Sequence, residues 1–263
     1  MRRVALTCAL VAFAANAFGE EAGQSEREHV PPDPPQTRVH EMPYHEMADM
    51  MGMDDRRRFG KVMIDRLEWQ DGDSSIYEWD AAAWYGGDFH KLWIETEGEH
   101  VDSMSTDARV EVLWDRIATA WWSTRLGMRW DVGDGPSQSW VAFGVAGLAP
   151  GFVELEAMAY VSDGGHTAVR LSTEYDLLLT QRLVLQPLFE LNAYSHDDPQ
   201  RLIGAGLSDL QLGLRLRYEF RREVAPYLGV NWSKRFGDSA DLAEAVGEDS
   251  DELSFVAGMR LWF

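Results

Sequence analysis

The stretch Leu210–Phe220 reads LQLGLRLRYEF, and every second residue in it is apolar. The positions between the apolar residues are Gln211, Gly213, Arg215, Arg217 and Glu219. Successive side chains of a strand point to opposite faces, so this segment has one apolar face and one charged face. Two-sided strands of this kind recur to the last residue, Phe263. The pattern predicts an all-β protein, a transmembrane antiparallel β-barrel of the outer-membrane type.

Composition agrees with this fold and limits the partners. A chain of 263 residues is long enough for one barrel domain. The net charge of −20 argues against nucleic acid as a partner, because phosphate binding needs a basic surface. The eleven Trp and eight Tyr have a natural place in aromatic girdles at the two membrane interfaces. We therefore expect outer-membrane lipid to be a partner.

Residues 1–17 have the pattern of a secretory signal peptide. Arg2 and Arg3 precede the apolar run Val4–Phe13, and Ala15-Asn16-Ala17 offers a small-residue cleavage site. A membrane anchor is the weaker alternative, because the run is shorter than the ~20 residues that span a bilayer. The one cysteine, Cys8, lies in this segment, so cleavage would leave no disulfide, cysteine metal ligand or cysteine nucleophile. No later stretch is apolar enough for a spanning helix, so strands would have to cross the membrane.

Residues 18–58 show neither a strand period nor a helix period. The segment contains Pro31-Pro32-Asp33-Pro34-Pro35 and is rich in Glu, His and Met. Such a composition buries too little apolar surface to order itself, so we expect a disordered tail, located in the periplasm.

Residues 59–263 are predicted to form the barrel, with about twelve strands; ten or fourteen remain alternatives. Most segments approach the ~9–11 residues of a tilted membrane strand. The candidates are 61–70, 75–85, 89–97, 108–115, 119–131, 138–147, 151–162, 166–178, 182–194, 207–219, 224–235 and 251–263.

The connections between these strands alternate between short and long. Bacterial barrels place short turns in the periplasm and longer loops outside. The tight set is Gly86-Gly87-Asp88, Arg116–Ala118, Leu148-Ala149-Pro150, Thr180-Gln181 and Arg221–Glu223, and the long polar set includes Gly98–Asp107, Ser195–Gly206 and Phe236–Ser250.

Parity assigns a face to each side chain of the barrel. A charge on the lipid face would cost ~2–4 kcal/mol at the midplane, which places charges inside. A soluble sandwich or lipocalin-like barrel would reverse the faces. The signal peptide, strand lengths, terminal Phe and turn asymmetry favour the membrane protein. The predicted lipid face includes Val169, Leu171, Tyr175, Leu177, Leu183, Leu185, Phe189, Leu191, Phe255, Ala257, Met259, Leu261 and Phe263. The predicted inward face includes Glu78, Asp80, Lys91, Glu95, Glu111, Arg125, Arg129, Glu154, Glu156, Arg170, Glu174, Asp176, Glu190, Arg215, Arg217 and Arg260.

The tail carries the clearest candidate for chemistry, the run His40–Met53. Five Met and two His fall within these fourteen residues. Thioethers are soft ligands that select Cu(I), whereas imidazole suits Cu(II), Zn and Ni. Neighbouring carboxylates would concentrate cations. The alternative is adaptable packing, with the Met residues on one face of a short amphipathic helix. The candidate metal ligands are His40, Met42, His45, Met47, Met50, Met51 and Met53.

Weaker candidates lie in the barrel. Most inward charges are expected to pair with opposite charges on neighbouring strands. Glu154, Glu156 and Met158 share a strand face and form a weak lumenal metal candidate. Four loop residues could together bind a cation at the outer rim: His100, Met104, His166 and His196. The simpler interpretation is that they are ordinary solvated loop residues.

Catalysis finds little support in the sequence. A nucleophile needs an adjacent base, and no Ser can be paired with any of the seven His residues. We predict that the protein is not an enzyme; a membrane-embedded lipase is the alternative.

Four strings resemble the copper resistance protein B family: Tyr77–Glu99 (YEWDAAAWYGGDFHKLWIETEGE), Tyr175–Asn192, Gly206–Trp232 and Phe255–Phe263. The similarity covers nearly the whole chain from about Arg58. It implies an outer-membrane barrel with a Met/His-rich N-terminal region that acts in bacterial copper tolerance, with a periplasmic multicopper oxidase as a partner. It also implies that the seven Met and His residues above are copper ligands, with Cu(I) as the favoured ion and Cu(II) as the alternative. The single compact cluster departs from relatives with many Met-rich repeats, so a low copper stoichiometry is expected.

These observations predict an outer-membrane copper-binding protein of copper resistance and homeostasis. The tail would capture copper, and the charged barrel would retain it or pass it on. A small general porin or channel with an incidental tail is the alternative, and a scaffold that docks a periplasmic partner is a third.

Overall fold

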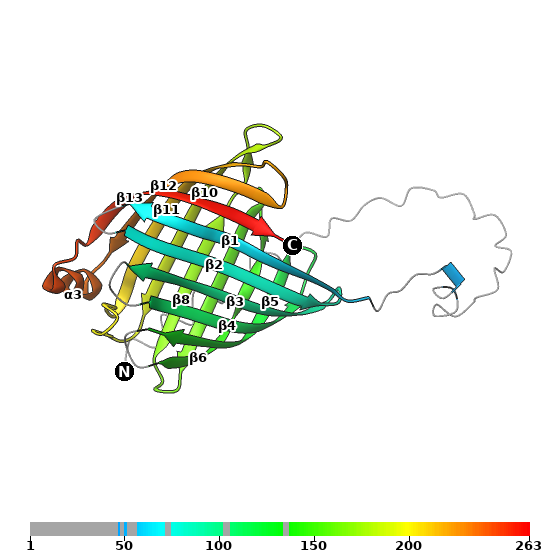
Figure 1. Cartoon of the computed structure of the whole chain (residues 1–263). Coiled ribbons are helices and arrows are strands. Elements are labelled where there is room, and N and C mark those ends of the chain that lie inside the picture. Colours follow the sequence, from blue (N-terminus) through cyan, green and yellow to red (C-terminus); the bar gives the residue numbers. More distant parts are fainter. Residues whose placement is uncertain (1–46, 48–49, 52–56, 72–74, 102–105, 134–136) are drawn as a thin grey trace, which may run out of the picture. The chain divides into compact units, whose positions relative to one another are not determined.

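The structure is a computed structural model that describes residues 47, 50–51, 57–71, 75–101, 106–133 and 137–263. Twelve long strands of this described part form a closed antiparallel barrel, in which sequence neighbours pair. The barrel closes between its first and last strands, where Trp69 lies opposite Ala257. Figure 1 shows the tilted strands following one another around the barrel in sequence order. The predicted fold and the predicted strand number are confirmed.

The strand bounds lie mostly within three residues of the predicted segments. The long strands are β1 (Phe59–Asp71), β2 (Ser75–Gly86), β3 (His90–Val101), β4 (Thr106–Ile117), β5 (Trp122–Val132), β6 (Gln138–Ala149), β7 (Val153–Ser162), β8 (Thr167–Glu174), β10 (Leu183–Tyr194), β11 (Gly206–Tyr218), β12 (Val224–Arg235) and β13 (Asp251–Trp262).

The predicted strand 166–178 is interrupted. It consists of β8 and the two-residue β9 (Leu177–Leu178), which both pair with β10. The register of these pairings places the interruption at Tyr175 opposite Pro187. Proline has no N–H to donate to a neighbouring strand, so the ladder loses a hydrogen bond at this point.

The two ends of the barrel differ, as the turn asymmetry predicted. The five connections at one end, 87–89, 118–121, 150–152, 179–182 and 219–223, are short, and Phe59 and Phe263 lie at the same end. We call this the tight-turn end. The opposite end carries the longer connections 195–205 and 236–250, and we call it the long-loop end.

The side chains alternate as parity predicted. On β11, Leu212, Leu214 and Leu216 are exposed, whereas Arg215 and Arg217 are buried. On β13, Phe255 is 66% exposed and its neighbour Val256 only 3%. A soluble monomer rarely exposes so large an apolar surface, and a lipid bilayer covers it.

One irregularity in β1 changes which residues face the lumen. The register between β1 and β2 shifts between Ile64 and Arg66, as at a β-bulge. Consequently the adjacent residues Asp65 and Arg66 both line the interior. An extra residue in one strand of a pair exchanges the faces of all residues beyond it.

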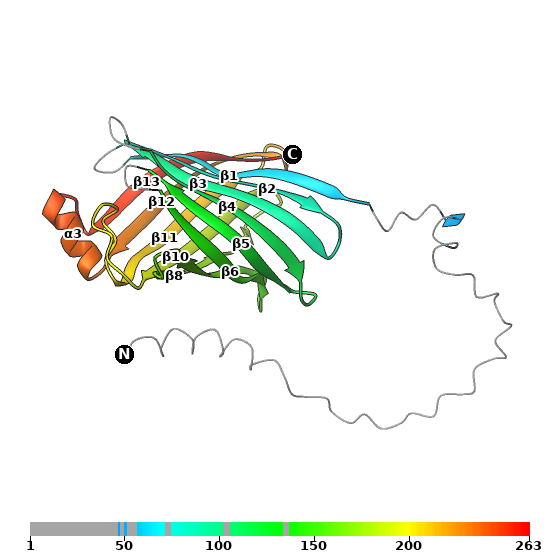
Figure 2. The same cartoon turned by 90° about the horizontal axis from the view of Figure 1, so that it is seen from below.

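A helix, α3 (Asp238–Val246), lies in the connection between β12 and β13 that was expected to be a loop. Gly247 ends it in the left-handed conformation, at φ 89°, which glycine adopts without strain. The backbone N–H of Gly204 donates to the Ser239 hydroxyl at 2.7 Å, so α3 is fixed to the connection between β10 and β11. Figure 2 shows α3 beside this connection at the long-loop end.

No helix in the described residues has the length and apolar character needed to span a membrane.

Candidate functional site

The charges predicted to face inward lie inside the barrel, where they line a cavity or form ion pairs. The centre of this network is Glu97 on β3. Its carboxylate pairs with Arg66 at 3.4 Å, with Arg170 at 2.9 Å, and with Arg109. Four strands separate β3 from β8 on the shorter way around the barrel, so the pair Glu97–Arg170 crosses the lumen. We call Glu97 and these three arginines the Glu97 layer.

A second cluster surrounds Arg125 on β5. Its guanidinium contacts Glu95 at 2.9 Å, Glu156 at 2.5 Å and Asp115 at 3.5 Å. The same guanidinium lies 4.8 Å from the ring centroid of Trp93, which is a cation–π contact. These partners come from β3, β4 and β7, so the arginine ties four strands together inside the barrel.

The most deeply buried ion pair joins β11 to β1. Arg215 donates to the two carboxylate oxygens of Glu68 at 2.8 and 3.1 Å, and the side chains are 3% and 0% exposed. Gln70 donates to the same carboxylate at 3.1 Å. A bidentate pair of this kind is strong and geometrically specific. Removal of one partner would leave a buried charge without compensation, which costs about 3–5 kcal/mol.

A cavity of about 770 Å³ lies in the part of the lumen nearer the tight-turn end. Its lining includes Lys61, Lys91, Glu154 and Arg260. Nine carboxylates and seven cationic side chains line it in total, so it is weakly anionic when all are ionised.

The weak candidate formed by Glu154, Glu156 and Met158 does not assemble as a ligand set. The two glutamates line the cavity, and Glu156 is paired with Arg125. Met158 is 1% exposed and belongs to a buried apolar cluster with Leu113, Trp140, Ala142, Tyr160 and Ala168. Side chains of this cluster fill the lumen beyond the cavity, as the interiors of small barrels are commonly filled.

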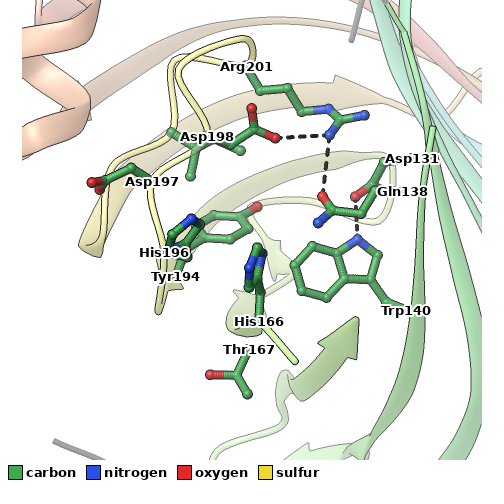
Figure 3. Close-up of a pocket in the computed structure, with 11 residues that line it drawn as sticks. Asp131, Gln138, Trp140, His166, Thr167, Tyr194, His196, Asp197, Asp198 and Arg201 are labelled. Carbon is green, nitrogen blue, oxygen red and sulfur yellow. Dashed lines mark hydrogen bonds and ion pairs between the residues drawn. The ribbon is translucent and has the colours of Figure 1, made fainter. Parts of the chain in front are cut away.

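A second, smaller cavity of about 190 Å³ lies towards the long-loop end (Figure 3). His166 and His196 line it together with Trp140 and Tyr194, and the rings of the two histidines face each other. Among the predicted outer-rim residues, the structure thus brings His166 and His196 together. His100 on β3 does not line this cavity, and Met104 lies outside the described residues.

Several residues of the network were not among the predicted inward-facing charges. Glu97 shares the parity of Glu95, so strict alternation along β3 identifies it. The bulge in β1 hides the inward position of Arg66 and Glu68, because it reverses the parity within one strand.

The profile of a family described as "Copper resistance protein B precursor (CopB)" matches residues 58–263. The chain belongs to the copper resistance protein B family. Copper resistance protein B of Escherichia coli is 44% identical over 203 residues, which cover 77% of this chain and 69% of the relative. A copper resistance protein B homolog of Pseudomonas syringae pv. tomato is 45% identical over 202 residues, or 76% and 69% of the two chains. Membership of this family gives the chain a role in copper resistance.

Solved structures support the fold of this chain. The NanC porin matches with a TM-score of 0.51 at 14% identity, over 77% of this chain and 99% of that one. The KdgM porin matches with a TM-score of 0.50 at 11% identity, over the same shares of the two chains. These similarities show the fold alone, an outer-membrane porin-like barrel.

The predicted copper ligands of this family member lie mostly beyond the described part. His40, Met42, His45 and Met53 are outside it, as are the predicted signal peptide and most of the predicted tail. Met47, Met50 and Met51 are described as helical, and the last two are 71% and 57% exposed. Among the described residues, no group of three or more His, Cys, Asp or Glu is arranged to hold a metal ion.

Proposed function

We propose that this member of the copper resistance protein B family captures Cu(I) with the seven Met and His residues of His40–Met53. In this proposal residues 1–17 are a signal peptide, residues 18–58 are a periplasmic tail, and residues 59–263 form the barrel. The observation that carries the proposal is the concentration of five thioethers and two imidazoles in fourteen residues of a family of copper resistance. Thioethers select Cu(I), and imidazole adds affinity for Cu(II).

The position of β1 supports a periplasmic tail. Phe59, the first residue of β1, lies at the tight-turn end, so the chain before it joins the barrel there. Short turns face the periplasm in outer-membrane barrels. Copper captured on this side would be within reach of a periplasmic multicopper oxidase, which we propose as a partner.

The lumen supports retention or controlled hand-over of copper. Its two cavities share no lining residue. Ion pairs of the Glu97 layer line the larger cavity, and the buried cluster around Met158 borders the smaller one through Trp140. A copper ion that enters the larger cavity would meet nine carboxylates, of which seven are already paired with arginines. We propose that the barrel limits free passage of copper, and that it acts by binding without catalysing a reaction.

A deletion tests the proposal. Removal of His40–Met53 should abolish most Cu(I) binding by the purified protein while the barrel still shows heat-modifiable gel mobility. The matched control removes Gly19–Pro32, fourteen residues without methionine. Unchanged Cu(I) stoichiometry in the His40–Met53 deletion would contradict the proposal.

A small general porin is the second candidate, favoured by the porin-like fold. Conductance in planar bilayers separates the two. The proposed function predicts low conductance that rises several-fold when Glu97→Ser and Arg170→Ser remove the pair across the lumen. High wild-type conductance that is indifferent to copper, together with unchanged copper tolerance on loss of the gene, would favour the porin.

A further inference from the structure

The register of β8 and β10 continues beyond the ends of these strands at the long-loop end. The backbone N–H of Ser195 donates to the Thr167 carbonyl at 2.8 Å, and the N–H of Thr167 donates to the Ser195 hydroxyl at 2.8 Å. One step further, the same register places His196 opposite His166. Their ring centroids are 4.2 Å apart, and the ring planes make an angle of 31°. The pair is therefore fixed by backbone pairing, not by a chance contact of two loops.

Both imidazoles face the mouth of the lumen. His166 has the parity of Ala168, which is buried in the interior cluster, and His196 has the parity of Tyr194, which packs against that cluster. Alternation along each strand then directs all four side chains inward. Figure 3 shows the two rings together in the cavity of about 190 Å³.

We propose that His166 and His196 form a Cu(II) site at the long-loop mouth of the barrel. Imidazole nitrogens suit Cu(II), which binds a given nitrogen site more tightly than the other divalent first-row ions. With two protein ligands, solvent completes the coordination sphere, so the site exchanges its ion readily. This site is separate from His40–Met53 and does not depend on copper capture by the tail.

The charges around the pair favour a cation. Asp131, Asp197 and Asp198 line the same cavity, together with one arginine, Arg201. Arg201 is held by Asp198 at 3.1 Å. Asp131 is paired with Arg129 at 2.7 Å, so the three carboxylates face two arginines and leave an excess of one negative charge, which raises the local concentration of cations.

The loop that carries His196 is held in place on both sides. Asp198 and Ile203 exchange backbone hydrogen bonds at 2.7 and 3.0 Å, and the Asp197 carboxylate accepts from the N–H of Ala205 at 2.6 Å. The hydrogen bond from Gly204 to Ser239 attaches the same loop to α3. This support and the pairing of Ser195 with Thr167 hold the backbone of both histidines, so only rotation of the two imidazoles about their side-chain bonds is needed to direct one nitrogen of each to the ion.

Cu(II) titration of the purified full-length protein tests the site. The variant His29→Gln/His40→Gln/His45→Gln serves as the background, so that the three imidazoles of residues 18–58 do not contribute. We expect one Cu(II) equivalent whose electron paramagnetic resonance spectrum shows coupling to two nitrogens. Loss of a group that only hydrogen-bonds to a metal ligand lowers metal affinity about 10–100-fold. His166→Gln and His196→Gln each remove a ligand itself, so each should lower the Cu(II) affinity by at least that factor.

The matched control is His90→Gln, which removes the imidazole that stacks on Trp114 near the tight-turn end. It should leave the Cu(II) equivalent unchanged. If His166→Gln fails to fold, His196→Gln carries the same test, because that side chain is exposed. The site is refuted if the variant His166→Gln/His196→Gln folds and keeps the two-nitrogen signal. Copper as its ion is refuted if an equal concentration of free Zn(II) displaces Cu(II).

Discussion

The segment His40–Met53 and the lumen of the barrel offer copper two different kinds of ligand. The segment concentrates five thioethers and two imidazoles, whereas the lumenal cavity is lined mainly by carboxylates and by the cations that balance them. A carboxylate that compensates a buried arginine cannot bind a metal ion without leaving that arginine unpaired. The contrast indicates that the paired lumenal charges hold the barrel together, and our proposal therefore assigns copper selectivity to the segment.

The largest effect is expected from the ion pair between Glu68 and Arg215. Glu68→Ala leaves the guanidinium of Arg215 buried without its carboxylate, so the free energy of unfolding should fall by about 3–5 kcal/mol. Urea unfolding in detergent, followed by heat-modifiable gel mobility, measures this loss. The Cu(I) stoichiometry of the folded fraction should stay that of the wild type.

The control for this variant is Glu223→Ala, which removes an exposed glutamate at the tight-turn end and should change stability by less than about 0.5 kcal/mol. If Glu68→Ala were as stable as the control but bound less copper, the lumenal charges would be metal ligands and the contrast would fail.

A smaller effect is expected on the outer face. Leu214→Arg places a charge near the middle of β11, on the face that meets lipid, and should cost about 2–4 kcal/mol. Gln211→Arg, on the inward face of the same strand, is the matched control and should cost less. Equal losses in folding experiments with lipid vesicles would argue against the assignment of the faces.

The smallest effect is expected for an ion pair in solvent. Arg235 and Glu248 lie 2.6 Å apart at the long-loop end, and their side chains are 37% and 49% exposed. Solvent screens such a pair, so Arg235→Ala should cost no more than about 1 kcal/mol. If Arg235→Ala lowered the free energy of unfolding as much as Glu68→Ala does, burial would not determine how much an ion pair contributes to stability.

The architecture could be predicted from the sequence because membrane strands repeat a simple pattern. Alternation in Leu210–Phe220 identified β11 and both of its faces, and turn residues marked the ends of most other strands. Parity alone predicts the inward positions of Arg125 and Glu190, and both side chains are buried in the structure.

The remaining features depend on where strands meet, which alternation does not reveal. The bulge between Ile64 and Arg66 reverses parity within β1, and the interruption at Tyr175 follows from Pro187 on a neighbouring strand. The facing pair His166 and His196 needs the exact register of β8 and β10. For α3 there was a local signal, since Asp238 and Gly247 are typical residues for a helix start and stop.

The central claim is that the thioethers of His40–Met53 bind Cu(I). Cu(I) titration of a variant with five Met→Leu substitutions, the five-fold variant, tests it most directly. Leucine at positions 42, 47, 50, 51 and 53 keeps the volume and apolar character of the side chains and removes every thioether of the segment. The control variant changes Met128 and Met259, on the outer face of the barrel, to leucine. We predict that the five-fold variant loses most Cu(I) binding while its barrel stays folded and the control binds as the wild type does. Full Cu(I) stoichiometry in the five-fold variant would contradict the account.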